Sequence, residues 1–329
     1  MRNLLLVFVF AAAAGLAGCA DSNPDGPVRW QDQPVVPELS GETREQFLAD
    51  VALADAAGRI PAVFAKVGDS NTEFPGNLYG FGCRPVDFGD QEGLGPVLDR
   101  YNAVEFPPTL ATEPGCTPTN SFSRLSAATR SGSYSVFPVT KIKDYNLVFG
   151  RPDPACSLEE IPLDCEIRLI NPRYTIVMTG TNDLGLDINF AGISPGTQLA
   201  PRLALVVARI RQAGSVPILS NLPPSWVPST PKVDEYGGIM VSNQQIAKLA
   251  EKVKVPVINL WRAMEEDQMV NRGLGPDGVH LSVYGGGKSP EVIQNSVNLT
   301  DEALRYGANR RNLIWLQTLA ALDEVAASP

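Results

Sequence analysis

Histidine is almost absent from this sequence, because His280 is the only one among 329 residues. No Cys-x-x-Cys motif occurs either. Zinc sites in proteins are built mainly from histidines and paired cysteines, so these two shortages argue against a structural or catalytic zinc. Histidine is also the one side chain whose unperturbed pKa lies near neutrality. Any proton transfer that needs an imidazole must therefore use His280.

Basic residues are also in short supply, with 27 Lys and Arg against 36 Asp and Glu. Removing residues 1–18, which contain Arg2 and no acidic residue, leaves 26 basic against 36 acidic residues and a net charge of −10. An acidic protein of this kind is poorly suited to bind phosphate backbones. We therefore expect no nucleic-acid partner.

The first 18 residues have the pattern of an export signal. Arg2 precedes an uncharged apolar run from Leu4 to Leu16 that is short for a permanent membrane span. The following Leu16-Ala17-Gly18-Cys19 resembles the lipobox of bacterial lipoproteins. That resemblance implies cleavage before Cys19 and a membrane anchor made by a lipid on this residue. Among lipoproteins, Ala20 in place of Asp favours the outer membrane or its periplasmic face.

The mature chain divides into a tether and one domain. Residues 19–40 are rich in Asp, Pro, Gly and Gln and show no apolar periodicity, which indicates a flexible tether. We assign residues 41–329 to one α/β domain with a loop-rich insertion at about 79–173. The insertion holds four cysteines, and an even count in an exported chain predicts two disulfides with three possible connectivities. Chain proximity favours pairing Cys83 with Cys116 and Cys156 with Cys165.

Strand-like and helix-like segments alternate along this domain. Short apolar runs predict strands at 60–67, 174–178, 216–220 and 255–260, and amphipathic patterns predict helices at 41–58, 198–212, 238–254 and 300–325. Within the insertion, 97–101 is typical of a helix and 145–149 of a strand. Such alternation predicts a three-layer, doubly wound parallel sheet covered by helices on both faces. Ligands bind at the carboxyl ends of the strands in such folds.

Three polar motifs follow these strands: Gly68-Asp69-Ser70, Gly180-Thr181-Asn182-Asp183 and Asp277-Gly278-Val279-His280. Each is also typical of turns and helix caps when taken alone. A serine at a strand-to-helix turn exposes its hydroxyl, and a carboxylate three residues before a histidine can orient the imidazole. Because all three motifs follow strands of one predicted sheet, they should lie at the same sheet edge. Together they predict an active site with a serine nucleophile there.

Together these motifs resemble three of the four sequence blocks of the SGNH (GDSL) hydrolase family, in the family's order, over residues 60 to 285. The resemblance implies a flavodoxin-like fold and an ester hydrolase that needs no metal or cofactor. Ser70 would be the nucleophile and an oxyanion donor, Asn182 a second donor, His280 the general base and acid, and Asp277 its orienting group. The remaining block supplies a backbone N–H, and either Ala127 or Gly132 fits that position.

The expected activity is hydrolysis of carboxylic esters, through an acyl-enzyme on Ser70. The expected substrates of this activity are acylated small molecules, lipids or acetylated glycans. An O-acyltransferase on the same fold and a non-catalytic ligand-binding lipoprotein are the alternatives. The presence of all four site residues argues against a decayed site. The insertion and the loop 222–227, with Trp226, are expected to form the walls.

Overall fold

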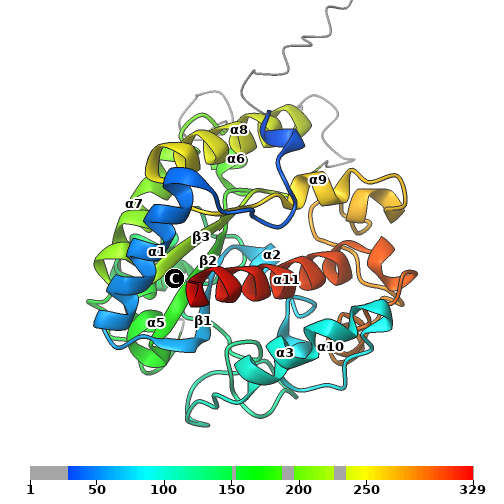
Figure 1. Cartoon of the computed structure of the whole chain (residues 1–329), viewed down its shortest axis with the longest axis horizontal. Coiled ribbons are helices and arrows are strands. Elements are labelled where there is room, and N and C mark those ends of the chain that lie inside the picture. The colour runs from blue at the N-terminus through cyan, green and yellow to red at the C-terminus, as the bar shows by residue number, and fades with distance from the viewer. Residues whose placement is uncertain (1–28, 150–152, 187–195, 226–234, 329) are drawn as a thin grey trace, which may run out of the picture.

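The computed structural model describes residues 29–149, 153–186, 196–225 and 235–328. Its centre is one four-stranded sheet in the order β1-β2-β3-β4, with all neighbouring strands parallel. The predicted parallel sheet is therefore confirmed (Figure 1). The strands are β1 (Ile60–Gly68), β2 (Pro172–Met178), β3 (Val216–Ser220) and β4 (Val257–Ile258).

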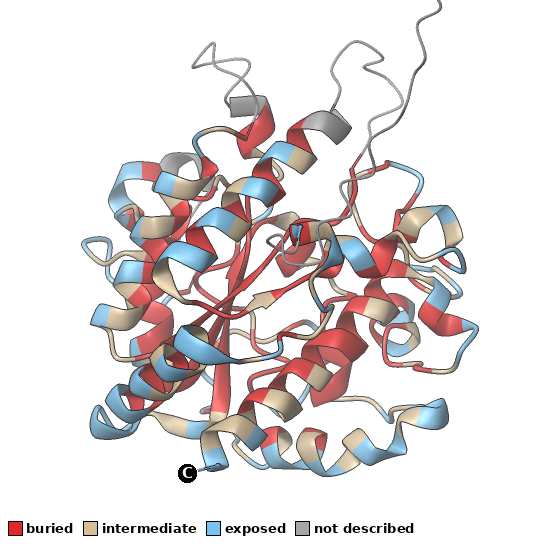
Figure 2. Ribbon diagram, turned by 45° about the horizontal axis from the view of Figure 1, so that its top comes forward, coloured by how far each residue is buried: buried red, intermediate tan, exposed pale blue. Residues whose placement is uncertain are grey.

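Long helices cover both faces of the sheet, as the alternating pattern predicts. One apolar core lies between the sheet and α1 (Gly41–Ala56), α3 (Gly95–Asn102) and α11 (Gly307–Ala327). A second lies between the other face and α5 (Pro162–Ile170), α7 (Leu199–Gln212) and α8 (Glu235–Val253). Neighbours in β2 alternate between them, since Ile176 joins the first core and Val177 the second. Figure 2 shows the strands buried and the outer helix faces exposed.

Shorter elements join these layers. The short α-helices are α2 (Ser70–Glu73), α4 (Ile142–Phe149), α6 (Asp183–Leu186), α9 (Leu260–Met264) and α10 (Ser289–Asn295). Short 3-10 segments lie at Trp30–Asp32, Tyr79–Gly82, Gly89–Leu94, Phe137–Val139, Val270–Gly273 and Ala303–Arg305. Among the described residues, no helix is long and apolar enough to cross a membrane.

The end of β1 is paired with a backbone segment on each side. Gly68 pairs with Met178 of β2 on one side and forms an isolated parallel bridge with Thr129 on the other. The chain thus runs from β1 to the Thr129 side and then crosses to β2. A reversal of this kind is the topological switch point at which α/β sheets bind ligands. Ser70 follows β1 at this point.

The insertion between β1 and β2 adds helices, turns and both predicted disulfides, and its described residues add no strand to the sheet. Cys83 is bonded to Cys116, and Cys156 to Cys165. The pairing chosen from chain proximity is confirmed. The second disulfide ties α5 to the segment that precedes it.

Four local predictions need correction. Residues 145–149 form the end of helix α4 and not a strand, and the insertion expected to be rich in loops also contains helix α5. The fourth strand covers only Val257–Ile258, and the last helix begins at Gly307 and not at Thr300.

The packed domain also begins earlier than residue 41. Residues 29–40, expected within the tether, contact the end of β4: Asn259 donates to the carbonyl of Trp30 at 2.8 Å, and its N–H donates to Val35 at 3.0 Å. The Trp30 ring packs edge-on against Trp261 at 5.1 Å. Residues 1–28, including the proposed signal and Cys19, lie outside the described residues, as does Trp226.

Candidate active site

Ser70 begins α2 directly after β1. β1 ends at Gly68, where a Cβ would collide with Thr72 and with the backbone of β2. Glycine therefore lets the chain turn close against the neighbouring strand. Asp69 caps α2, because its carboxylate accepts the Asn71 N–H at 3.1 Å.

The Asp69 carboxylate holds the second motif beside Ser70. It accepts the backbone N–H of Gly180 at 3.3 Å and that of Thr181 as well. Burial raises the pKa of Asp69 to about 6, since these backbone donors only partly offset the loss of water. The segment that carries Asn182 is thus fixed to the residue before Ser70.

Asn182 faces the far end of the insertion. Its side-chain amide donates to the carbonyl of Ser133 at 2.9 Å. The next residue, Asp183, is buried and accepts the N–H and O–H of Ser135 at 2.8 and 2.6 Å and the guanidinium of Arg202 at 2.8 Å. An amide carries two N–H groups, and the second one of Asn182 has no acceptor among the described residues.

The Asp277–His280 motif forms a turn that pairs the two side chains. Gly278 has φ +70°, and the Asp277 carboxylate accepts the N–H groups of Val279 and His280 at 3.0 and 2.9 Å. Its other oxygen contacts His280 Nδ1 at 2.7 Å. Burial favours a higher pKa for Asp277, but these hydrogen bonds outweigh it and hold the pKa below its ordinary value. The predicted contact is therefore present, and it leaves Nε2 on the other side of the ring.

Asn71 joins the Ser70 turn to the His280 turn. Its amide nitrogen donates to the carbonyl of Val279 at 3.2 Å, and its amide oxygen accepts the N–H of Leu281 at 3.3 Å. Val279 and Leu281 flank His280. The residue after Ser70 thus contacts both neighbours of the histidine, although Ser70 and His280 are about two hundred positions apart. Nothing in the local sequence around Asn71 indicates this long-range contact.

The third block runs along the end of β1. Gly68 donates its N–H to Ala128 at 3.1 Å and accepts that of Arg130 at 3.0 Å. Ala127 is fully buried, and its N–H donates to the Glu166 carboxylate at 2.8 Å. Gly132 has φ +76°, and no group among the described residues accepts its N–H.

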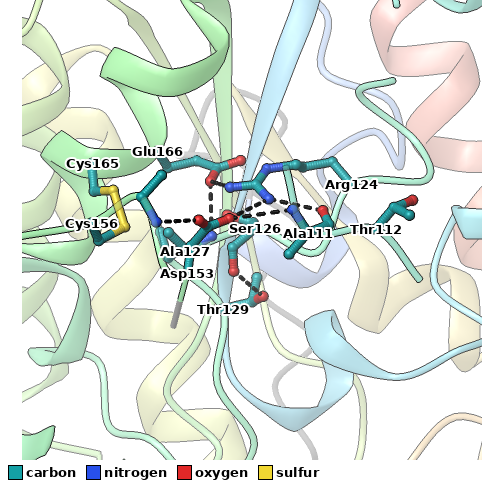
Figure 3. Close-up of polar contacts among 12 residues, drawn as sticks. Ala111, Thr112, Arg124, Ser126, Ala127, Thr129, Asp153, Cys156, Cys165 and Glu166 are labelled. Carbon is teal, nitrogen blue, oxygen red and sulfur yellow. Dashed lines mark hydrogen bonds and ion pairs between the residues drawn. A yellow bond between two sulfur atoms is a disulfide. The ribbon is translucent and has the colours of Figure 1, made fainter. Parts of the chain in front are cut away.

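A buried charge network contacts this block (Figure 3). The guanidinium of Arg124, 1% exposed, contacts Asp153 at 2.7 Å and Glu166 at 3.0 Å, and both carboxylates are fully buried. Glu166 therefore binds Arg124 and the Ala127 N–H together. Both carboxylates lie close in sequence to the Cys156–Cys165 disulfide, so the insertion's cross-link and this network hold the same region.

No metal centre accompanies these groups in the part of the chain that the structure describes. Nowhere in the described ranges do three or more His, Cys, Asp or Glu residues come together as candidate ligands of a metal ion. The arrangement instead offers a hydroxyl, an imidazole oriented by a carboxylate, and several N–H donors at one sheet edge. Those are the groups required for nucleophilic attack on a carbonyl.

Comparison with solved structures gives similarities of low identity. A GDSL-like lipase from Bacteroides thetaiotaomicron is 14% identical, with 75% of this chain and 94% of that chain covered and a TM-score of 0.40. A lipase/acylhydrolase from Enterococcus faecalis is 15% identical, with 77% and 93% covered and a TM-score of 0.40. An acetylxylan esterase from Geobacillus stearothermophilus is 12% identical, with 78% and 93% covered and a TM-score of 0.42. A search of curated proteins gives no match.

Comparison with protein families gives a match to the GDSL-like Lipase/Acylhydrolase family over residues 157–286. The matched segment contains Asn182, Asp277 and His280, whereas Ser70 precedes it. It also includes β2, β3 and β4, of which β2 lies beside β1 in the sheet. Residues 157–286 of the chain are therefore similar to the GDSL-like Lipase/Acylhydrolase family.

Proposed function

We propose that this protein is a serine esterase that hydrolyses carboxylic esters through an acyl-enzyme on Ser70. The observation that carries the proposal is the bridge made by Asn71, which joins the Ser70 turn to both neighbours of His280. The imidazole is in turn paired with Asp277 at 2.7 Å. Nucleophile, base and orienting carboxylate therefore belong to two segments in direct contact at the switch point of the sheet.

Acylation begins when His280 Nε2 takes the proton of the Ser70 hydroxyl. The Ser70 oxygen bonds to the ester carbonyl carbon, and the carbonyl electron pair moves onto the carbonyl oxygen. When this tetrahedral intermediate collapses, the bond to the alcohol oxygen breaks. His280 then returns the proton to the departing alkoxide, so that a neutral alcohol leaves and the acyl group stays on Ser70.

Deacylation repeats these steps with water. His280 takes a proton from water, the hydroxide oxygen bonds to the acyl carbon, and collapse of the second intermediate breaks the bond to Ser70. The proton returns to the serine oxygen, and a carboxylic acid is released. Asp277 keeps the imidazole in the tautomer with Nε2 free and stabilises the imidazolium formed in each half-reaction.

Three N–H donors are proposed to stabilise the oxyanion: the backbone N–H of Ser70, the second amide N–H of Asn182, and the backbone N–H of Gly132. Ala127 is the weaker choice for the third donor, because its N–H already donates to Glu166. Each donor aimed at the developing charge is worth about 10²–10³-fold in kcat in other hydrolases.

The site is accessible, since 38% of the His280 side chain and 54% of the Asp277 side chain are exposed. An open site suits an acyl group presented by a larger molecule, such as a lipid or an acetylated glycan. The proposed export signal and lipid on Cys19 would hold the enzyme at a membrane, on its outer-membrane or periplasmic face.

A fluorophosphonate probe tests this proposal, because it reacts with serines that a neighbouring base activates. We expect the parent protein to be labelled and Ser70→Ala to remain unlabelled. Ser282→Ala, which changes a serine on the histidine loop whose hydroxyl donates to the Gly273 carbonyl, is the control and should be labelled like the parent. Equal labelling of parent and Ser70→Ala would exclude Ser70 as the nucleophile.

A further inference from the structure

We infer that Asn71 is a positioning residue whose side-chain amide sets the distance between the Ser70 hydroxyl and the His280 imidazole. The inferred effect on turnover rests on the proposed esterase function. The inferred structural role, which is to hold the histidine turn against the end of β1, does not. The two parts can therefore be tested separately.

The backbone of Asn71 is held on both sides. Its N–H donates to the buried Asp69 carboxylate at 3.1 Å, and its carbonyl accepts a guanidinium N–H of Arg311 at 2.6 Å. Arg311 comes from α11 and is fully buried. Burial lowers the pKa of Arg311 to about 9, so the guanidinium still carries its charge at neutral pH. With both backbone groups fixed, the side chain projects from a rigid base.

The side chain uses both ends of its amide. The nitrogen donates to the Val279 carbonyl, and the oxygen accepts the Leu281 N–H. Asn71 is 1% exposed, so water does not substitute for either partner. A carboxylate of the same shape lacks the donor, and an apolar side chain lacks both functions. The contact therefore requires an amide at this position.

The histidine turn fixes its own internal geometry, but not its distance from Ser70. Asp277 accepts the two N–H groups that follow it, and Gly275 donates to the His280 carbonyl at 2.8 Å. These bonds hold Asp277 and His280 relative to each other. Asn71 adds the link to the nucleophile's turn. Because a displacement of about 1 Å in a catalytic group costs about 10²-fold in rate, this link bears directly on turnover.

The test compares Asn71→Ala and Asn71→Asp with a matched control, Asn77→Ala. Asn77 is a fully buried asparagine a few residues along, and its amide donates to the Thr72 carbonyl and not to the histidine turn. We expect Asn71→Ala to lower kcat for p-nitrophenyl acetate about 100-fold with KM little changed. Asn77→Ala should lose stability while keeping kcat. A kcat for Asn71→Ala equal to that of Asn77→Ala would overturn the inferred effect on turnover.

Hydrogen exchange at the Leu281 amide tests the structural role without any substrate. Exchange should be faster in Asn71→Ala than in the parent, and unchanged in Asn77→Ala. In Asn71→Asp, which has the shape of the native side chain and keeps the acceptor, the Leu281 amide should stay protected although kcat falls. Unchanged exchange in Asn71→Ala would overturn the positioning role, whatever the activity.

The two proposals fail in different ways. If Ser70→Ala hydrolysed esters like the parent, the esterase proposal would fail, and faster Leu281 exchange in Asn71→Ala would still support the link. If Ser70→Ala were inactive while Asn71→Ala kept full turnover and full protection, the inference on Asn71 would fail alone.

Discussion

Replacing His280 with Gln should reduce kcat for p-nitrophenyl acetate by at least about a thousandfold. Glutamine has nearly the size of histidine and can hydrogen-bond, but it cannot accept the proton of Ser70. The sequence has no second histidine that could take over. Since the imidazole contacts Asp277 at 2.7 Å, the variant also removes the partner of that carboxylate. Steady-state kinetics on purified variants measures the effect.

The matched control is Pro276→Ala, which changes an exposed residue of the same turn and should keep the parent's kcat. Because hydrogen bonds hold the pKa of Asp277 below its ordinary value, that carboxyl stays charged across the assay range and contributes no pH-dependent step of its own. If His280→Gln turned over like Pro276→Ala, an imidazole base would be ruled out.

Replacing Arg124 with Met should destabilise the fold by about 3–5 kcal/mol, because it leaves buried charges without their partner. Asp153 and Glu166 are fully buried, and both lose their contact with the guanidinium. The Ala111 carbonyl loses a donor at 2.8 Å as well. Burial disfavours the charged guanidinium, yet the two carboxylates outweigh it and raise the pKa of Arg124. Urea denaturation at neutral pH, with the disulfides intact, gives the free energy of unfolding.

Arg168→Met is the control for this experiment. Arg168 contacts Glu160 at 2.8 Å from the same region, but its side chain is 51% exposed. Exposed ion pairs contribute about 0–1 kcal/mol, so this variant should unfold close to the parent's midpoint. If the two variants lost equal free energies of unfolding, burial would not explain how much the Arg124 network contributes to stability.

The positions of the site motifs could be predicted from sequence because their determinants are local. Gly68, Asp69 and Ser70 follow a buried strand directly, and Asp277 reaches His280 within one turn. The choice between Ala127 and Gly132 could not be made in this way. It depends on Glu166, which takes the Ala127 N–H from 39 residues along the chain. The contact of Asn71 with the histidine turn spans more than two hundred residues.

The errors in secondary structure have the same origin. Tyr, Leu, Val and Phe at 145–149 favour a strand, yet the first N–H groups of α4, those of Ile142 and Lys143, donate to the carbonyls of Glu160 and Leu158. These distant partners satisfy the start of a helix that its composition does not predict.

Two other boundaries were set by side-chain contacts. Threonine is a common N-cap residue, which favours a helix start at Thr300. In the structure, however, the N–H and hydroxyl of Thr300 donate to the Asn298 side chain at 3.0 and 2.7 Å. α11 therefore begins later, at Gly307. β4 is short because Asn259 accepts the Arg262 N–H and starts α9. Pro256 also lacks an N–H for the sheet.

The central claim is that an acyl group is carried by Ser70 during turnover. Rapid acid quenching of the parent with p-nitrophenyl acetate, followed by mass spectrometry of the proteolytic peptides, tests it most directly. We expect one acetyl group on the peptide that contains Ser70, formed within the first turnover and absent from His280→Gln. Steady hydrolysis with no acetylated Ser70 peptide at any quench time, or acetylation of a different residue in the active protein, would contradict the account.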